Sequence, residues 1–305
     1  MGTNNNLLAY LTALIRTAFM RKNTVIGVFL DIKGAYDNVK IQVLYEQLIE
    51  AKIPITICNL IYRILDNINV YIKDREGEII GPKRATVGLV QGSPLSPLLF
   101  NIYIKKIFDI IPNTVKLLGY ADDLVLLIEG NNVIQMTREI NKTLLIINTF
   151  LTLHNLELAK QKCEAIWFKQ HNSNLVLLDI WVGGEKIQYK KHVKYLGVTL
   201  QRNLSWDMQI NNSIIKAKKG LNIIKAFRGT WWGADPKTLG MALNGLVRSH
   251  LEFAAFILEP TTQKNIKKLD SIYNQGLRIV TGCMRSTPIP ALYAECRTFN
   301  KQSIN

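Results

Sequence analysis

Hydrophobic and polar positions follow two spacings along the chain, and these spacings predict the elements of the fold. Residues 5–20 place seven apolar side chains on one helical face. Residues 24–32, TVIGVFLDI, are apolar and β-branched, as is typical of a buried strand. The same patterns predict helices at 37–51, from Pro54, at 93–111 and at 133–156, two strands within 69–87, a strand–turn–strand at 115–128, and strands at 163–168, 175–187 and 193–200.

The pattern changes near residue 205, after which only helical spacing remains. Helices are expected at 213–227, 236–258 and 263–282. The chain is therefore expected to be α+β over its first two thirds and all-α over the last third. We place the domain boundary near residue 203, which gives domains 1–203 and 204–305.

Composition and charge narrow the class of protein. The chain has 305 residues, and its 48% hydrophobic content is typical of a globular protein. Its long apolar runs are interrupted well before the roughly 20 residues needed to cross a bilayer, so a soluble intracellular protein is expected, nuclear or cytoplasmic. The net charge of +15 indicates either a polyanionic partner such as nucleic acid or simply a basic surface.

Two adjacent aspartates, Asp122 and Asp123, interrupt the apolar run LLGYADDLVLLIEG at 117–130. Asp31 ends the predicted strand 24–32, and a sheet can bring the two segments side by side. Three carboxylates in one place repel one another unless a cation lies between them, and oxygen ligands suit Mg²⁺. Two such ions could hold the attacking and leaving oxygens of a phosphoryl transfer. On these residues alone, the simpler interpretation is that the aspartates cap a tight turn.

Five segments occur in an order that resembles a known family. They are FLDIKGAYDNV (29–39), GLVQGSPLSPLLFN (88–101), YADD (120–123), LELAKQKCEAIWF (156–168) and KYLGVTL (194–200). They are similar to palm motifs A to E of the reverse transcriptases of non-LTR (LINE-type) retrotransposons. The resemblance implies a right-hand palm, an antiparallel sheet with helices on one face, followed by an all-α thumb-like domain. It also implies RNA-directed DNA polymerase activity, a nucleotidyl transfer to a primer 3′-OH.

The resemblance also implies which residues do the chemistry. Asp31, Asp122 and Asp123 would be catalytic ligands of two Mg²⁺ ions, with Mn²⁺ as a substitute. The backbone carbonyl of Ile32 would join them. Lys162 matches the motif D lysine, which would protonate or neutralise the departing pyrophosphate.

Other motif residues would bind the nucleotide. Tyr36 stands where the family places an aromatic ring against the sugar, which favours deoxynucleotides. Gln91 and Gly92 would contact the nucleotide or template, and Ser93 would open the following helix. Asp37 is interpreted as a cap of the helix after it.

The remaining predicted site residues concern nucleic acid. The motif E turn, at Tyr195, Leu196 and Gly197, would hold the primer 3′ end. Basic side chains along the first thumb helix would bind phosphates, namely Lys216, Lys218, Lys219 and Lys225. The partners implied are an RNA template, a DNA primer and deoxynucleoside triphosphates, with no membrane.

The resemblance is incomplete upstream of motif A. Residues 1–23 match only the part of the fingers that adjoins motif A, so we expect a fragment, weak or inactive alone, whose fingers or endonuclease regions lie elsewhere in the full-length element. Three alternatives stay open. One is another palm polymerase, such as an intron maturase or an RNA-dependent RNA polymerase, and the second is a non-catalytic nucleic-acid-binding remnant. The third is a basic structural protein.

Overall fold

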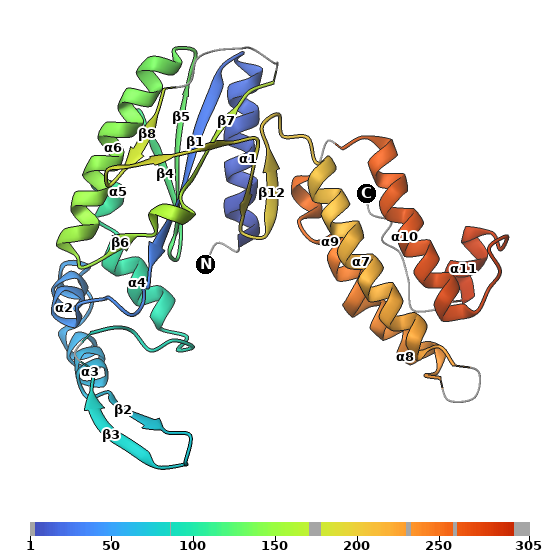
Figure 1. Ribbon diagram of the computed structural model, residues 1–305, viewed down its shortest axis with the longest axis horizontal. Coiled ribbons are helices and arrows are strands. Elements are labelled where there is room, and N and C mark those ends of the chain that lie inside the picture. The colour runs from blue at the N-terminus through green and yellow to red at the C-terminus, as the bar shows by residue number, and fades with distance from the viewer. Residues whose placement is uncertain (1–3, 86, 171–177, 230–232, 259–260, 296–305) are drawn as a thin grey trace. The chain divides into compact units, whose positions relative to one another are not determined.

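A computed structural model describes residues 4–85, 87–170, 178–229, 233–258 and 261–295 (Figure 1). The chain forms two compact units, residues 14–191 and residues 1–13 with 192–305. The units group residues 192–203 with the helices, whereas the sequence assigned them to the palm, and the functional boundary near residue 203 stays a prediction.

A central sheet organises the unit 14–191. Its strand order is β10-β7-β1-β5-β4, and the short strand β6 also pairs with β1 (Figure 1). β10 and β7 run parallel and the other pairs antiparallel. The expected α+β fold with a mainly antiparallel sheet is therefore confirmed. The bounds are β1 Thr24–Lys33, β4 Lys116–Tyr120, β5 Asp123–Gly130, β6 Glu157–Leu158, β7 Glu164–Phe168 and β10 Tyr189–Lys190.

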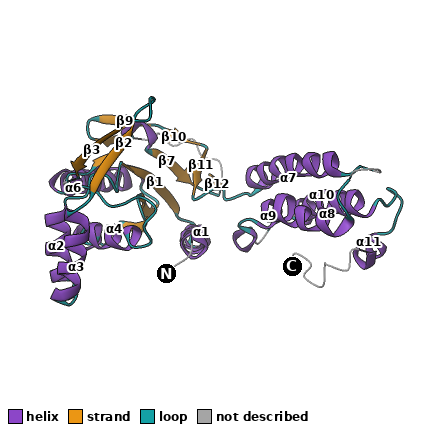
Figure 2. Ribbon diagram, turned by 90° about the horizontal axis from the view of Figure 1, so that it is seen from below, coloured by secondary structure: helices purple, strands orange, loops and turns teal. Residues whose placement is uncertain are grey.

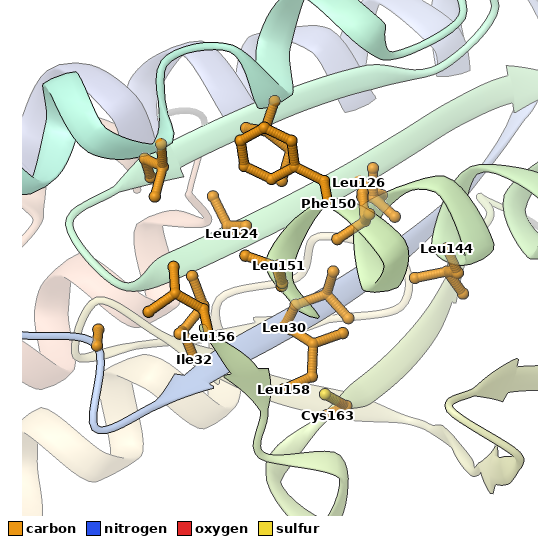
Figure 3. Packing of buried hydrophobic residues seen from close by; sticks show 14 of the residues in the cluster. Leu30, Ile32, Leu124, Leu126, Leu144, Phe150, Leu151, Leu156, Leu158 and Cys163 are labelled. Atoms are coloured by element: carbon orange, nitrogen blue, oxygen red, sulfur yellow. The ribbon is translucent and has the colours of Figure 1, made fainter. Parts of the chain in front are cut away.

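The core of this unit lies on one face of β1 and β5. Leu30 and Ile32 from β1 are buried with Leu124 and Leu126 from β5. Helix α6 (Val133–Leu153) adds buried residues to this cluster, including Leu144, Phe150 and Leu151 (Figure 3). Each fully buried leucine or isoleucine contributes about 1.5–3 kcal/mol to folding. This packing fixes which side chains of the two strands face away from the cluster.

The other elements of this unit largely follow the sequence pattern. The helices are α2 (Ile41–Glu50), α3 (Ile55–Asp66), α4 (Ser96–Ile104) and α5 (Ile107–Ile110), and α1 is Asn4–Met20. Hairpin β2 (Asn69–Lys73) and β3 (Ile79–Arg84) and hairpin β8 (Ile180–Val182) and β9 (Glu185–Ile187) complete the unit, with a 3₁₀ turn at Lys160–Lys162. The helix expected over 93–111 is divided in two, and 175–177 of the expected strand lie outside the described residues.

The second unit combines one hairpin with packed helices. β11 (His192–Tyr195) pairs with β12 (Val198–Gln201). Helix α7 (Asp207–Phe227) packs along α8 (Pro236–Leu243) and α10 (Gln263–Thr281), as Figure 2 shows. The single helix expected over 236–258 is instead α8, a π-helical turn Asn244–Arg248, α9 (Ser249–Glu252) and a 3₁₀ turn Ala255–Ile257. α11 (Ile289–Glu295) follows α10 and was not predicted.

Within the part of the chain that the structure describes, no helix combines the length and apolarity that crossing a membrane requires.

Close helix packing in this unit depends on Gly220 in α7. A Cβ there would overlap the backbone carbonyl oxygen of Leu246, which cannot move as a side-chain tip can. We therefore expect Gly220→Ala to lower the free energy of unfolding of the helical unit by about 2 kcal/mol, because overpacking outweighs the gain in helix propensity. Urea unfolding followed by circular dichroism measures this change.

Gly240 in α8 is the matched control, since a Cβ there meets nothing within 4 Å. Gly240→Ala should stabilise the unit by about 0.5–1 kcal/mol through helix propensity alone. Equal stabilisation by both substitutions would contradict the packing described for Gly220.

Candidate active site

The pairing of β1 with β5 brings the three predicted carboxylates together. Asp31 and Asp123 are direct partners in the antiparallel register. Asp122 lies beside them in the two-residue turn that links β4 to β5, where Ala121 has a φ of 53°. A left-handed conformation at a non-glycine residue is strained, and such strain is common at functional sites.

The charges of this cluster are poorly compensated. The pKa of Asp123 is raised from near 3.8 to about 6, chiefly by burial and then by the neighbouring charges of Asp122 and Asp31. Lys162 acts in the opposite direction. A carboxyl with this pKa would gain from any cation placed between the three aspartates.

The ammonium of Lys162 supplies part of the missing positive charge. Its Nζ donates to Oδ2 of Asp31 at 2.9 Å, and this hydrogen bond is the main cause of its raised pKa. The backbone holds the lysine there, because Ala159 N donates to Asp31 O at 2.8 Å and β6 pairs with β1 just beyond. Lys160, the near neighbour, instead donates to Gly183 O at 3.0 Å. The structure therefore brings Lys162, and not Lys160, to the carboxylates.

The donor set fits a hard divalent cation, although the side chains are not yet arranged as ligands. Within the described residues, no three His, Cys, Asp or Glu side chains stand in positions ready to hold a metal ion. The cluster nevertheless offers only carboxylate oxygens, has excess negative charge and already attracts one ammonium group. These are properties that suit Mg²⁺ or Mn²⁺. The part expected of the Ile32 carbonyl stays a prediction.

Tyr36 lies close to the aspartates. Its ring is half-buried and packs against Phe100, with ring centroids 5.3 Å apart. The pKa of its phenol is raised by burial and, next, by the charge of Asp122. An aromatic wall therefore stands next to the turn that carries Asp122.

The glycine-rich segment before α4 is attached to the turn after β1. Gly88 N donates to Val39 O at 2.9 Å, and Leu89 N donates to Tyr36 O at 2.8 Å. Gln91 is exposed, and Gly92 has a φ of 88° with open space around it. The two backbone hydrogen bonds therefore hold the loop that carries Gln91 and Gly92 against the loop that carries Tyr36.

Two local interpretations were wrong. Asp37 does not cap α2, which begins after Lys40 without a side-chain cap. Its Oδ1 instead accepts a hydrogen bond from Nε2 of Gln91 at 2.8 Å, so it orients the predicted nucleotide contact. Ser93 does not open α4, because this helix begins at Ser96, and the Ser93 hydroxyl accepts from Leu95 N at 3.3 Å within the preceding turn. Both errors concern polar residues whose partners are not fixed by local sequence.

The predicted primer-binding turn is a tight hairpin in the other unit. Leu196 and Gly197 have φ values of 45° and 82°, which suits a two-residue turn between β11 and β12. Tyr195 is buried, so its side chain does not face solvent. The roles of the three residues in holding a primer stay predictions.

The four predicted phosphate-binding lysines are all exposed on α7. At about 100° per residue they form two pairs on different sides of the helix, Lys216 with Lys219 and Lys218 with Lys225. Their roles in binding nucleic acid stay predictions, but the two pairs cannot all face one flat surface.

Solved structures show the fold. Telomerase from Candida albicans, in complex with a TWJ fragment of telomeric RNA, matches with a TM-score of 0.50 and 11% sequence identity. The match covers 97% of this chain and 55% of that one. At this identity the likeness supports a right-hand polymerase fold and nothing more specific.

Curated relatives come from retrotransposable elements of insects. The Pol polyprotein of type-1 retrotransposable element R2 of Nasonia vitripennis is 27% identical over 304 residues, which cover 93% of this chain and 28% of that protein. The RNA-directed DNA polymerase from mobile element jockey of Drosophila melanogaster is 24% identical over 64% of this chain and 22% of that protein. The chain spans about a quarter of the length of these relatives. They confirm the resemblance to non-LTR retrotransposon enzymes.

The family is shown by a match over most of the chain. Residues 5–200, which contain all the aspartates of the site, Lys162 and the β11–β12 turn, match the family described as reverse transcriptase (RNA-dependent DNA polymerase). The chain belongs to the reverse transcriptase family.

Proposed function

We propose that this chain provides the polymerising centre of a retrotransposon reverse transcriptase, which adds deoxynucleotides to the 3′-OH of a DNA primer on an RNA template. The observation that carries this proposal is the β1–β5 register, which sets Asp31 opposite Asp123 with Asp122 in the adjoining turn. Carboxylates that meet in this way, with the pKa of Asp123 raised to about 6, are typical of a site that operates with bound cations.

Asp31, Asp122 and Asp123 would hold two divalent ions, joined by the Ile32 carbonyl. Such ions would stabilise the charge on the attacking and leaving oxygens. In the reaction a bond forms between the primer 3′-oxygen and the α-phosphorus, and the bond from that phosphorus to pyrophosphate breaks. The carboxylates fix where this exchange takes place, because their backbone positions are set by paired strands rather than by a loop.

Lys162 would change partners during the cycle. Its ammonium now neutralises Asp31, and it is largely exposed, with 71% of its side chain accessible. When cations occupy the carboxylates, the lysine becomes free to approach the departing pyrophosphate and to donate a proton to it or neutralise it.

The nucleotide would be selected by the loops beside the carboxylates. The Tyr36 ring, held against Phe100, would exclude a ribose 2′-hydroxyl. Gln91, oriented by Asp37, would contact the base or template, and Gly92 would allow the backbone to approach closely. The β11–β12 turn and the α7 lysines would bind the primer and its duplex.

Primer extension tests the proposal. With a poly(rA) template, an oligo(dT) primer, dTTP and Mn²⁺ or Mg²⁺, the purified chain should add template-directed nucleotides, at a low rate. Asp122→Ala should lower the rate about 100-fold or more, because a group that stabilises transition-state charge is lost. Titration with Mn²⁺ followed by electron paramagnetic resonance should show a matching loss of metal binding.

Asp109→Ala is the control, since Asp109 is an exposed carboxylate of the same unit on α5. It should leave both extension and Mn²⁺ binding unchanged. A wild-type chain that gives no metal-dependent product, and whose Mn²⁺ binding is left unchanged by Asp122→Ala, would refute the catalytic proposal and favour a nucleic-acid-binding remnant.

Sugar selection provides a second test. Tyr36→Val should raise the incorporation of UTP relative to dTTP by about 10-fold or more, because removing the ring opens space for a 2′-hydroxyl. Single-nucleotide incorporation with each substrate measures this ratio. A wild-type preference for UTP would instead indicate an RNA polymerase.

The charge balance of the site predicts a pH effect on stability. A raised carboxyl pKa contributes stability at pH below about 3.8, and this contribution is lost as the pH rises through about 6. In EDTA, Asp123→Asn should therefore stabilise the chain at pH 7.5 by about 1 kcal/mol, after allowance for the partial exposure of this group. At pH 4 the gain should nearly vanish. Thermal unfolding at both values measures it.

Asp109→Asn should show no such dependence on pH. Equal stabilisation by Asp123→Asn at both pH values would mean that the charge of Asp123 is not the cause.

A further inference from the structure

An open groove between α7 and α10 is lined by four lysines from two helices. It has a volume of about 530 Å³, with Lys218 from α7 and Lys264, Lys267 and Lys268 from the start of α10. Ser271 and Gln275 add a hydroxyl and an amide, and Ile214 and Ile272 complete the lining. The groove belongs wholly to the helical unit, in which 16 Lys and Arg stand against 6 Asp and Glu, a net charge of +10 out of +15.

The lysines of the groove lack close acidic partners. Among the described residues, none of the four forms an ion pair within 4.0 Å. The pKa of the Asp207 carboxylate is lowered first by a hydrogen bond from Asn265, and Lys268 and Lys264 are the smallest causes of its shift. Asp207 Oδ2 also accepts a hydrogen bond from the Ser205 hydroxyl at 3.2 Å. The positive charge of the groove is therefore left for an external partner.

The placement of Lys264 in the first turn of α10 opposes helix stability. α10 begins at Gln263 and has no acidic residue in its first turn. The backbone amides of a helix N-terminus favour anions, and cations there are unfavourable. Lys264 also repels Lys267 and Lys268, at i+3 and i+4. This arrangement costs folding stability, but it places positive charge beside the backbone amides at the start of α10. Such a helix end can bind the anionic oxygens of a phosphate.

The two helices hold these lysines on a rigid frame. Asn265 Nδ2 donates to Asp207 Oδ1 at 2.9 Å, which joins the start of α10 to the start of α7. Farther along, Gly276 allows close approach, since a Cβ there would lie 3.1 Å from Leu221 of α7 and would overlap Leu243 of α8. Because the helices hold the backbone of these lysines, binding orders less of the chain here than it would on a mobile loop.

We propose that this groove binds the phosphate backbone of a nucleic-acid strand, at a site separate from the side of α7 that carries Lys216 and Lys219. The proposal rests on the proposed function in taking nucleic acid as the partner. Lysines one helical turn apart stand about 5–6 Å from one another at Cβ, similar to the step between successive phosphates. Hydroxyl and amide groups such as those of Ser271 and Gln275 commonly accompany lysine at phosphates. Lys264, Lys267 and Lys268 thus become nucleic-acid contacts that the sequence did not reveal.

The salt dependence of binding tests the groove. Fluorescence anisotropy would measure the affinity of a labelled RNA–DNA duplex and of each single strand between about 50 and 200 mM KCl, in EDTA without nucleotides. The triple variant Lys264→Gln, Lys267→Gln, Lys268→Gln should reduce the slope of log K against log[salt] by about 2 to 3. Its thermal midpoint should equal or exceed that of the wild type, because unfavourable charges are removed from α10.

The control is Lys105→Gln, Lys191→Gln, Lys237→Gln, which removes the same charge from exposed positions outside the groove. Its slope should stay within about 1 of the wild-type value. Equal slopes for the groove variant and the wild type, or an equal loss in the control, would overturn the proposal. So would competition by poly-glutamate as effective as that by nucleic acid of equal charge, which would indicate an acidic protein partner.

Failure of this proposal is separable from failure of the proposed function. Binding is measured without metal or nucleotide, whereas polymerisation needs both. Asp122→Ala should keep the wild-type salt slope while losing extension. If the chain extends primers but the groove variant keeps the full slope, only the groove assignment fails.

Discussion

The antiparallel pairing of β1 with β5 is the constraint on which the rest of the site depends. Side chains alternate along a strand, so a slip by one residue would turn Asp31 toward the core and Leu30 and Ile32 away from it. The cluster that includes Leu124 and Leu126 excludes that register at a cost of several kcal/mol. The hydrophobic core therefore positions the carboxylates, and like charges that would drift apart on a loop are kept together.

The backbone pairing that gathers the three carboxylates also places a positive charge beside them. β6 continues the sheet beside the end of β1, and the hydrogen bond from Ala159 to Asp31 leads directly into the turn that carries Lys162. The lysine is thus placed by main-chain pairing, and only its flexible ammonium needs to move. A counter-ion on a long, exposed side chain can neutralise the aspartates and still be displaced by stronger cations.

The sequence predicted those elements of the fold that depend on neighbouring residues or on regular apolar spacing. The strands around Asp31 and Asp123 and the long helix α6 follow from apolar spacing, and the family resemblance predicted the three carboxylates that the sheet brings together. Sequence failed where a polar side chain has a distant partner. Asp37 is a residue type that often caps helices, but its carboxylate accepts a hydrogen bond from Gln91, which lies 54 positions later in the chain. No local sequence pattern distinguishes these two roles. In the sequence, the lysines at the start of α10 resemble an ordinary solvent-exposed helix face. Only the packing of α7 beside α10 shows that they line a groove.

The two units concentrate charge of opposite sign, carboxylates in one and lysines in the other. In the α/β unit, acidic groups are held close enough for burial and mutual repulsion to raise the pKa of Asp123, so positive charge brought to this cluster would be stabilising. In the helical unit, lysines without close acidic partners gather where a helix already presents its positive end, so negative charge brought to this groove would be stabilising. Under the proposed function, divalent ions would meet the first need, and nucleotide phosphates and a nucleic-acid backbone would meet the second. Folding alone gains nothing from either arrangement, because each concentrates charge of one sign.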